Sequence, residues 1–244
     1  MSKLYEHQDY EEALENFKNS SCKWKAFTDV HLKVSKDRCP ICECDFNETI
    51  TRLSNKGTTS IEKTIDHFRP QQYYSFLKCE HTNYLLMCSE CNNIYKGSEF
   101  PIYNNASRAT KNEELESEKY LIVNPLRDNL LELFTLVFKR TISGRNILEL
   151  HPKQESGYLF EKAKETIKLF GLGDCHTNRH TNENVYNCRI SILESHYGVF
   201  YNFVTALKDG DKKKAYLELK EQKSTFEQYG FYEFIKKNQF EVYL

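Results

Sequence analysis

The chain of 244 residues contains little glycine and little proline, with nine Gly and five Pro. Such a composition excludes a collagen-like or loop-rich chain. No run reaches the roughly 18–20 apolar residues that a membrane-spanning helix needs, so we expect no integral membrane protein. The stretch Met1–Tyr10 is polar and acidic and lacks the apolar segment of a signal peptide, which predicts a cytoplasmic rather than a secreted protein.

An excess of basic residues is also missing. The formal net charge is −1, and residues 1–100 hold 13 Lys and Arg against 15 Asp and Glu. Domains that bind nucleic acid without help are usually basic, because phosphate contacts supply most of their non-specific affinity. The charge balance therefore predicts that this chain binds a polyanion weakly unless a partner contributes positive charge.

Aromatic residues and cysteines are abundant. Phe and Tyr number 16 each, and hydrophobic residues make up 39% of the chain, which predicts a packed core rather than disorder. The nine cysteines are expected to lie in a reducing compartment. Paired cysteines there bind metal or take part in chemistry more often than they form disulfides.

Changes in composition and in the spacing of apolar residues along the sequence predict three regions. Residues 1–37 read as a helical segment, because apolar residues recur at helical spacing. Residues 38–101 combine paired cysteines, polar turns and short β-prone runs, as in a small metal-organised unit. Residues 102–244 read as mostly helical, for packing or for docking a partner. The expected fold is mainly α with a small ββα-metal unit, α+β overall.

Four further elements are expected in the third region. Leu131–Phe138 and Asn146–Leu150 form a plausible hairpin, and Gly157–Phe170 reads as a helix that ends at Gly171. Between Asn182 and Leu207, apolar residues alternate at spacings of four and three, a heptad-like seam. This seam either docks a partner or packs into the protein's own C-terminal core.

Two Cys-x-x-Cys pairs, Cys39/Cys42 and Cys88/Cys91, predict a structural zinc site. Two residues between thiols let both sulfurs approach one ion, and two such turns complete a tetrahedral site. Zinc is favoured over an iron–sulfur cluster, whose motifs more often form compact multi-cysteine runs. The alternatives are buried free thiols or a redox pair, and Cys44 and Cys79 are rival ligands. Most of the other cysteines are expected to be buried apolar residues.

Between and beside these pairs lie residues suited to phosphodiester hydrolysis. Asp66 and Asn92 offer a carboxylate and an amide oxygen, which suit a hard divalent cation. His67 can then deprotonate water, and Asn83 can fix the tautomer of the imidazole. A helix that starts at the second cysteine pair presents Asn92 and Lys96 on one face. Taken singly, each residue can also occur without any catalytic role, for example as a helix cap or as an exposed surface side chain.

The order of these motifs resembles the HNH (ββα-metal) endonucleases with a four-cysteine zinc knuckle. Within that superfamily it is most similar to the HNH subunit of Septu-type anti-phage systems, which also accompanies some retrons. The motifs that carry this resemblance are Cys39xxCys42, Asp66-His67-Phe68-Arg69-Pro70, Asn83-Tyr84-Leu85-Leu86-Met87-Cys88xxCys91-Asn92-Asn93xxLys96 and Phe100-Pro101. They cover residues 38–101, and the similarity beyond residue 120 is looser.

The resemblance implies a role for each matching residue. His67 corresponds to the general base, Asp66 to a ligand of a catalytic Mg²⁺ or Mn²⁺, and Asn83 to the asparagine that orients the histidine. Asn92 stands where the family often has its last histidine, as the second metal ligand. This exchange of imidazole for an amide oxygen is compatible with Mg²⁺ and weakens binding of soft metals.

The resemblance also implies contacts and partners. Arg69 and Lys96 correspond to phosphate contacts, although Lys96 can equally be a solvated surface residue. A companion ATPase of the SMC/ABC type is expected, in some systems with a retron reverse transcriptase, and no membrane. The substrate is expected to be DNA. RNA such as tRNA is one alternative, and a non-catalytic zinc knuckle that binds nucleic acid or protein is another.

Overall fold

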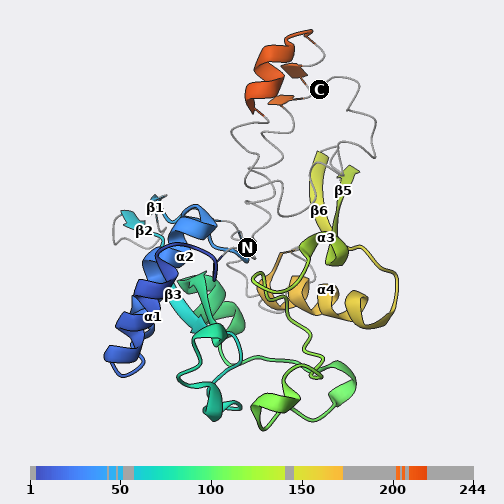
Figure 1. Ribbon diagram of the computed structural model, residues 1–244. Helices are drawn as coiled ribbons and strands as arrows, with labels where there is room; N and C mark the ends of the chain where they lie inside the picture. Colours follow the sequence, from blue (N-terminus) through green and yellow to red (C-terminus); the bar gives the residue numbers. More distant parts are fainter. Residues whose placement is uncertain are drawn as a thin grey trace. The chain divides into compact units, whose positions relative to one another are not determined.

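A computed structural model describes most of the first 172 residues and short parts of the remainder. The described residues are 4–42, 44–47, 49–51, 58–140, 146–172, 202–203, 205–206 and 209–218. They belong to two compact units, residues 1–128 and residues 129–244 (Figure 1). Within the described ranges, no helix combines the length and the apolar character that a membrane span requires.

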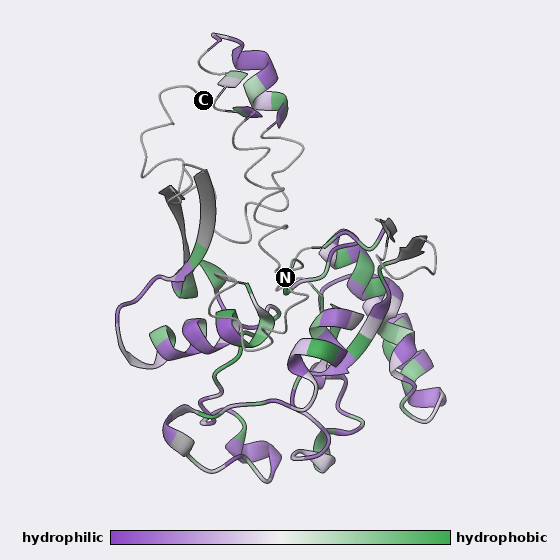
Figure 2. Cartoon of the chain, turned by 180° about the vertical axis from the view of Figure 1, so that it is seen from behind, coloured by the Kyte–Doolittle hydropathy of each residue, from purple (hydrophilic) through white to green (hydrophobic). Residues whose placement is uncertain are grey.

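The first unit begins with three helical segments. They are α1 (Tyr10–Asn19), the 3₁₀ helix η1 (Trp24–Phe27) and α2 (Thr28–Ser35). Helix α1 buries Tyr10, Ala13 and Phe17, which recur at the three- and four-residue spacing of one helical face. Figure 2 shows the other residues of α1 as largely hydrophilic. The helical segment expected from the sequence is confirmed.

A strand–strand–helix unit follows. The antiparallel strands β3 (Lys63–His67) and β4 (Tyr84–Cys88) pair with Asp66 opposite Leu85 and His67 opposite Tyr84. The π-helix η4 (Glu90–Lys96) begins two residues after β4 ends. All five residues of β4 are buried, so this strand is covered on both faces. A separate short hairpin, β1 (Thr49–Thr51) with β2 (Thr58–Ser60), precedes β3.

The N-terminal helices share a core with this hairpin. The rings of Phe17 and Phe27 lie 5.6 and 6.0 Å from the ring of Tyr84 on β4. The aromatic residues of both segments therefore bury one another within the first compact unit. The division between the two units lies between Asp128 and Asn129.

A second aromatic cluster lies on the C-terminal side of β3. The ring of Phe100 lies 5.4 Å from Phe68, 5.4 Å from Tyr74 and 5.8 Å from Tyr120. An isolated antiparallel β-bridge between Ile102 and Tyr120 brings together the two ends of the segment between them, next to this cluster. Single 3₁₀ turns occupy the connections: η2 (Ser75–Leu77), η3 (His81–Asn83), η5 (Tyr103–Asn105) and η6 (Asn112–Glu114).

In its described residues, the second unit contains a hairpin, the helices α3 and α4, and a helical segment over residues 212–218. The short helix α3 (Leu130–Leu133) leads into β5 (Phe134–Arg140), which pairs with β6 (Asn146–Pro152). Helix α4 (Gly157–Phe170) ends at Gly171, whose φ of 63° lies in the left-handed region that favours glycine at a helix end. The hairpin and this helix were expected from the sequence and are confirmed.

One further expectation concerns residues outside the described ranges. The heptad-like seam expected between Asn182 and Leu207 falls on residues that the structure largely does not describe. In the described ranges, helices occur beside three two-stranded antiparallel sheets, which confirms an α+β fold.

Candidate nuclease site and metal centre

Five cysteine side chains gather where the first cysteine pair meets the second. The Sγ atoms of Cys39 and Cys91 lie 3.6 Å apart, and those of Cys42 and Cys88 lie 3.7 Å apart. Cys44 joins them, since its Sγ lies within 4.8 Å of the Sγ atoms of Cys39, Cys42 and Cys88. Cys39, Cys42, Cys88 and Cys91 are buried, and Cys44 is half-buried.

Two of the sulfur separations match those of a tetrahedral metal site. Zinc–sulfur bonds of about 2.3 Å place the sulfurs of a four-thiolate site about 3.8 Å apart, close to the 3.6 and 3.7 Å of the two pairs above. Backbone N–H groups of Cys88 and Cys91 donate to the Sγ atoms of Cys39 and Cys88, each at 3.4 Å. Such hydrogen bonds favour the thiolate form that binds metal. The cluster can therefore hold a metal ion such as zinc.

The close contacts among these thiols shift their pKa values in opposite directions. Hydrogen bonds with neighbouring thiols, chiefly with Cys39, lower the pKa of Cys88 far below its usual range, whereas contacts chiefly with Cys39 raise the pKa of Cys42. Hydrogen bonds with Cys39, Cys42 and Cys88 raise the pKa of Cys44. Cys44 is one of the two rival ligands named from the sequence, and it lies beside the expected four. The other rival, Cys79, forms a disulfide with Cys22, with their Cα atoms 5.4 Å apart. Cys22 and Cys79 are therefore not among the buried free cysteines that the sequence predicts for most of this group.

Strand β3 and helix η4 bring the expected polar residues together in two pairs. Lys96 Nζ lies 2.7 Å from Asp66 Oδ2 and donates to the backbone carbonyl of His67 at 3.1 Å. Asn92 Nδ2 donates to Thr64 Oγ1 at 3.1 Å. Thr64 and Asp66 are two apart on a strand and thus share a face, while Asn92 and Lys96 share a face of the helix. Asp66 and Asn92 therefore belong to one polar layer between strand and helix.

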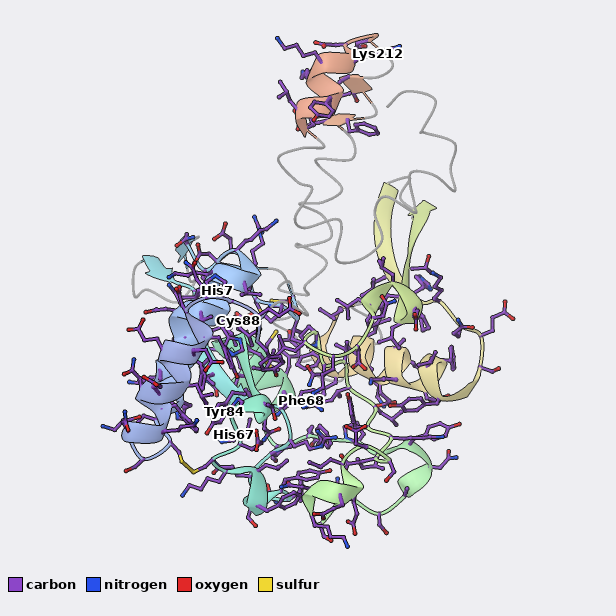
Figure 3. The ribbon with its side chains drawn as sticks, viewed as in Figure 1. His7, His67, Phe68, Tyr84, Cys88 and Lys212 are labelled. Atoms are coloured by element: carbon purple, nitrogen blue, oxygen red, sulfur yellow. A yellow bond between two sulfur atoms is a disulfide. The ribbon has the colours of Figure 1, made fainter. Side chains whose placement is uncertain are left out.

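His67 ends β3 in a half-buried position. Its Nε2 lies 3.2 Å from the carbonyl oxygen of Lys78 and 2.8 Å from the side-chain nitrogen of Gln71. Its ring meets the ring of Tyr84 edge to face at 4.9 Å (Figure 3). These three neighbours, from the opposite strand and the connection between the strands, fix the orientation of the imidazole.

Burial shifts the pKa of both residues of the Asp-His pair. Desolvation lowers the pKa of His67 below its usual value, so the imidazole is neutral at neutral pH. Desolvation also raises the pKa of Asp66, an effect that the nearby ammonium of Lys96 opposes. The site thus combines a neutral histidine with a buried carboxylate that already has a cationic neighbour.

Asn83 holds the backbone beside His67 rather than its ring. Its Oδ1 accepts from the backbone N–H of Arg69 at 2.9 Å, and its Nδ2 donates to the carbonyl of Arg69 at 3.0 Å. A further bond joins the N–H of Phe68 to the carbonyl of Asn83 at 2.7 Å. The contacts of Asn83 thus reach the backbone of Phe68 and Arg69, and its role in orienting His67 stays a prediction.

Arg69 is buried in the second aromatic cluster. Its Nε donates to Glu118 Oε2 at 2.7 Å, and only 6% of its side chain is exposed. The guanidinium lies 5.0 Å from the ring centre of Tyr120 and within about 6 Å of three other rings. Arg69 therefore contributes to packing in this structure and can reach a phosphate only by leaving Glu118. Lys96, with a side chain 0% exposed, is likewise no surface lysine.

Three neighbours of His67 were not found from the sequence. Lys78 acts through a backbone carbonyl, to which every residue type contributes equally, so no sequence pattern could identify it. Gln71 lies four residues after His67 in a turn and carries no distinctive motif. Tyr84 stands next to Asn83 in the quoted motif, and its pairing opposite His67 in the β3–β4 register was the signal that could have found it.

Comparison with known proteins identifies one distant relationship. The chain is 29% identical over 168 residues to the Septu protein PtuB of Bacillus mycoides strain KBAB4, a match that covers 64% of this chain and 51% of the relative. The chain therefore spans about half the length of the curated relative that it matches. No family model and no solved structure matches the chain. The similarity and the cysteine cluster together support a distant relationship to the Septu proteins.

Proposed function

We propose that this chain is a metal-dependent HNH endonuclease that hydrolyses phosphodiester bonds in DNA. The observation that carries the proposal is the strand–strand–helix unit. His67 ends β3 in this unit. Asp66 of the strand pairs with Lys96 of the helix, and Asn92 of the helix donates a hydrogen bond to Thr64 of the strand. A knuckle that only binds nucleic acid or protein has no use for this combination beside a cysteine cluster.

His67 is the general base in this proposal. A carbonyl oxygen can only accept a hydrogen bond, so the contact with Lys78 requires a proton on Nε2. The lone pair then lies on Nδ1, where it can take a proton from water. Rotation of the Gln71 side-chain amide by 180° places its oxygen, rather than its nitrogen, against the same Nε2–H. Both orientations fit, because the amide nitrogen and oxygen have nearly the same size. The lowered pKa keeps His67 unprotonated and ready to act near neutral pH.

Asp66 and Asn92 would hold the divalent cation. Their carboxylate and amide oxygens are the hard donors that Mg²⁺ and Mn²⁺ prefer, and both side chains belong to the same polar layer. A cation bound there supplies Lewis-acid stabilisation of the phosphate and of the leaving oxygen. Lys96, which pairs with Asp66 in this structure, can turn toward a phosphate oxygen or stay with the carboxylate.

The decisive experiment compares His67→Ala with the unchanged chain. Cleavage of DNA and of RNA is measured with Mg²⁺ and with Mn²⁺, and we expect His67→Ala to be slower by about 10²–10⁴-fold, the usual cost of losing a general base. The control is His7→Ala, because His7 lies near α1 and does not contact the site. Cleavage by His67→Ala at the unchanged rate would leave the binding-module alternative. A preference for RNA would replace DNA as the substrate.

The relationship to the Septu protein PtuB supports a role in defence against phage. We propose that the chain acts there as the nuclease of a complex with an ATPase. Its near-neutral charge agrees with such an arrangement, because a partner can bring the nucleic acid to a nuclease that binds it weakly.

A further inference from the structure

The disulfide between Cys22 and Cys79 lies next to the residues that orient His67. Cys22 follows helix α1, and Cys79 lies in the connection between β3 and β4, 57 residues later in the chain. Figure 3 shows the bond between the two sulfurs. The cross-link therefore attaches the β3–β4 connection to the N-terminal helices.

Cys79 directly follows the residue whose carbonyl contacts the imidazole. The carbonyl oxygen of Lys78 lies 3.2 Å from His67 Nε2 and accepts a hydrogen bond from the hydroxyl of Tyr84 at 2.8 Å. Tyr84 also packs edge to face on the His67 ring. A shift of Cys79 thus moves a carbonyl that two residues of the site share.

The cysteines of this pair are more accessible than those of the metal cluster. Cys79 is exposed and Cys22 is half-buried, whereas Cys39 and Cys91 are each 0% exposed. Ser21 and Cys22 have φ values of 56° and 64°, a region that residues with a Cβ adopt at a cost. Without the cross-link, this segment is therefore free to relax toward other backbone conformations.

We propose that Cys22 and Cys79 form a reversible redox site that controls the placement of the Lys78 carbonyl against His67. The consequence for catalysis rests on the nuclease function proposed above. Disulfides in a reducing compartment are usually transient and regulatory, so a cytoplasmic location makes this bond a switch rather than a permanent brace. The oxidised form holds the imidazole in the orientation that the structure shows.

The reaction is thiol–disulfide exchange with a small disulfide of the glutathione class. The Cys79 thiolate attacks one glutathione sulfur, and the other glutathione leaves as a thiolate. The Cys22 thiolate then attacks Cys79 Sγ in the mixed disulfide, and the second glutathione leaves. Two protein thiols and one glutathione disulfide thus give one protein disulfide and two glutathione thiols, which take up the two protons.

Two measurements on the zinc-loaded full chain test this proposal without using nuclease activity. Alkylation with mass spectrometry, in glutathione buffers from reducing to oxidising, reports which cysteines are free. NMR of the ¹⁵N-labelled imidazoles reports the tautomer and the pKa of His67, with His67→Ala to assign its signals. We expect Cys22 and Cys79 to be protected together in oxidising buffer and the His67 signals to differ between the two states. Cys79→Ser should show the reduced His67 signals in both buffers.

Cleavage rates supply the third readout. We expect the oxidised chain to cut faster than the reduced chain by about tenfold, because small misplacements of a catalytic group are costly. Cys22→Ser and Cys79→Ser should cut at the reduced rate in both buffers.

Alkylation of both cysteines in oxidising buffer, or identical His67 signals in the two states, would overturn the proposal. If His67 responds and neither state cuts nucleic acid, the redox coupling is supported and the nuclease function is contradicted.

Discussion

A buried ion pair lies beside the end of β3. Arg69 and Glu118 form an ion pair in which the side chains are 6% and 2% exposed. Glu118 also accepts hydrogen bonds from the hydroxyl of Tyr74 and the N–H of Ala109, at 2.7 and 2.8 Å. One carboxylate thus joins the end of β3 to the segment that follows η4, with Arg69 as its cationic partner.

Arg69→Met should destabilise the protein strongly. It leaves the carboxylate of Glu118 buried without its cation, which typically costs about 3–5 kcal/mol of unfolding free energy. Urea unfolding of the zinc-loaded chain measures this loss. In the double variant Arg69→Met, Glu118→Met much of the stability should return, because the isolated buried charge is gone. If Arg69→Met instead keeps full stability and weakens nucleic-acid binding, Arg69 is a phosphate contact as the sequence predicted.

His31 should make the stability depend on pH. It is 2% exposed on α2, its Nδ1 has no hydrogen-bond partner among the described residues, and burial lowers its pKa to about 4. Below the usual pKa of about 6.5 the unfolded chain takes up a proton that the folded chain refuses. The unfolding free energy should therefore fall by about 3 kcal/mol as the pH drops from 6.5 to 4.

Comparison with His31→Leu isolates this contribution. Leucine does not titrate, so the pH dependence of its unfolding free energy should be flatter by about the same amount. Release of zinc at low pH affects both proteins equally and cancels in the difference. An equal slope in both proteins would show that His31 is not buried in its neutral form.

Among the elements, the β3–β4 hairpin has the greatest influence on the site. Its register places Asp66 and His67 opposite Leu85 and Tyr84, and η4 begins two residues beyond its second strand. The cysteine cluster connects the junction of β4 and η4 to the turn at residues 39–42. Metal binding and folding of the hairpin should therefore be coupled, so that loss of the metal unfolds the hairpin.

Removing zinc should disorder this element. Metal binding to structural zinc sites contributes about 10 kcal/mol or more of folding free energy in small domains. Titration with a chelator, followed by circular dichroism and elemental analysis, should show loss of structure in step with loss of zinc. Cys44→Ser is the matched comparison, since it removes a cluster thiol outside the two Cys-x-x-Cys pairs. We expect Cys44→Ser to keep its zinc and Cys91→Ser to lose it. The opposite result would show that Cys44, rather than Cys91, is the fourth zinc ligand.

At the scale of the whole molecule, local patterns predicted more than long-range contacts. The helices over 10–35 and 157–170, the β5–β6 hairpin and the cysteine cluster follow from spacing that involves near neighbours in sequence. The burial of Arg69 and the pairing of Lys96 with Asp66 depend on which segments meet in space, so they did not follow from those patterns. The Cys22–Cys79 disulfide was missed because its 57-residue separation matches no motif.

The charge of the whole chain leads to the last prediction. With 34 Lys and Arg against 35 Asp and Glu, the chain has no excess of positive charge, and Arg69 and Lys96 are paired with Glu118 and Asp66. The affinity of the isolated chain for DNA should therefore be weak at physiological salt, and its logarithm should fall only slightly with the logarithm of salt concentration. The complex with a co-expressed ATPase should bind more tightly and show a steeper salt slope, because the partner neutralises more phosphates. Fluorescence anisotropy across a salt series measures both slopes, and equal slopes with tight binding by the isolated chain would show that this chain needs no partner to reach its substrate.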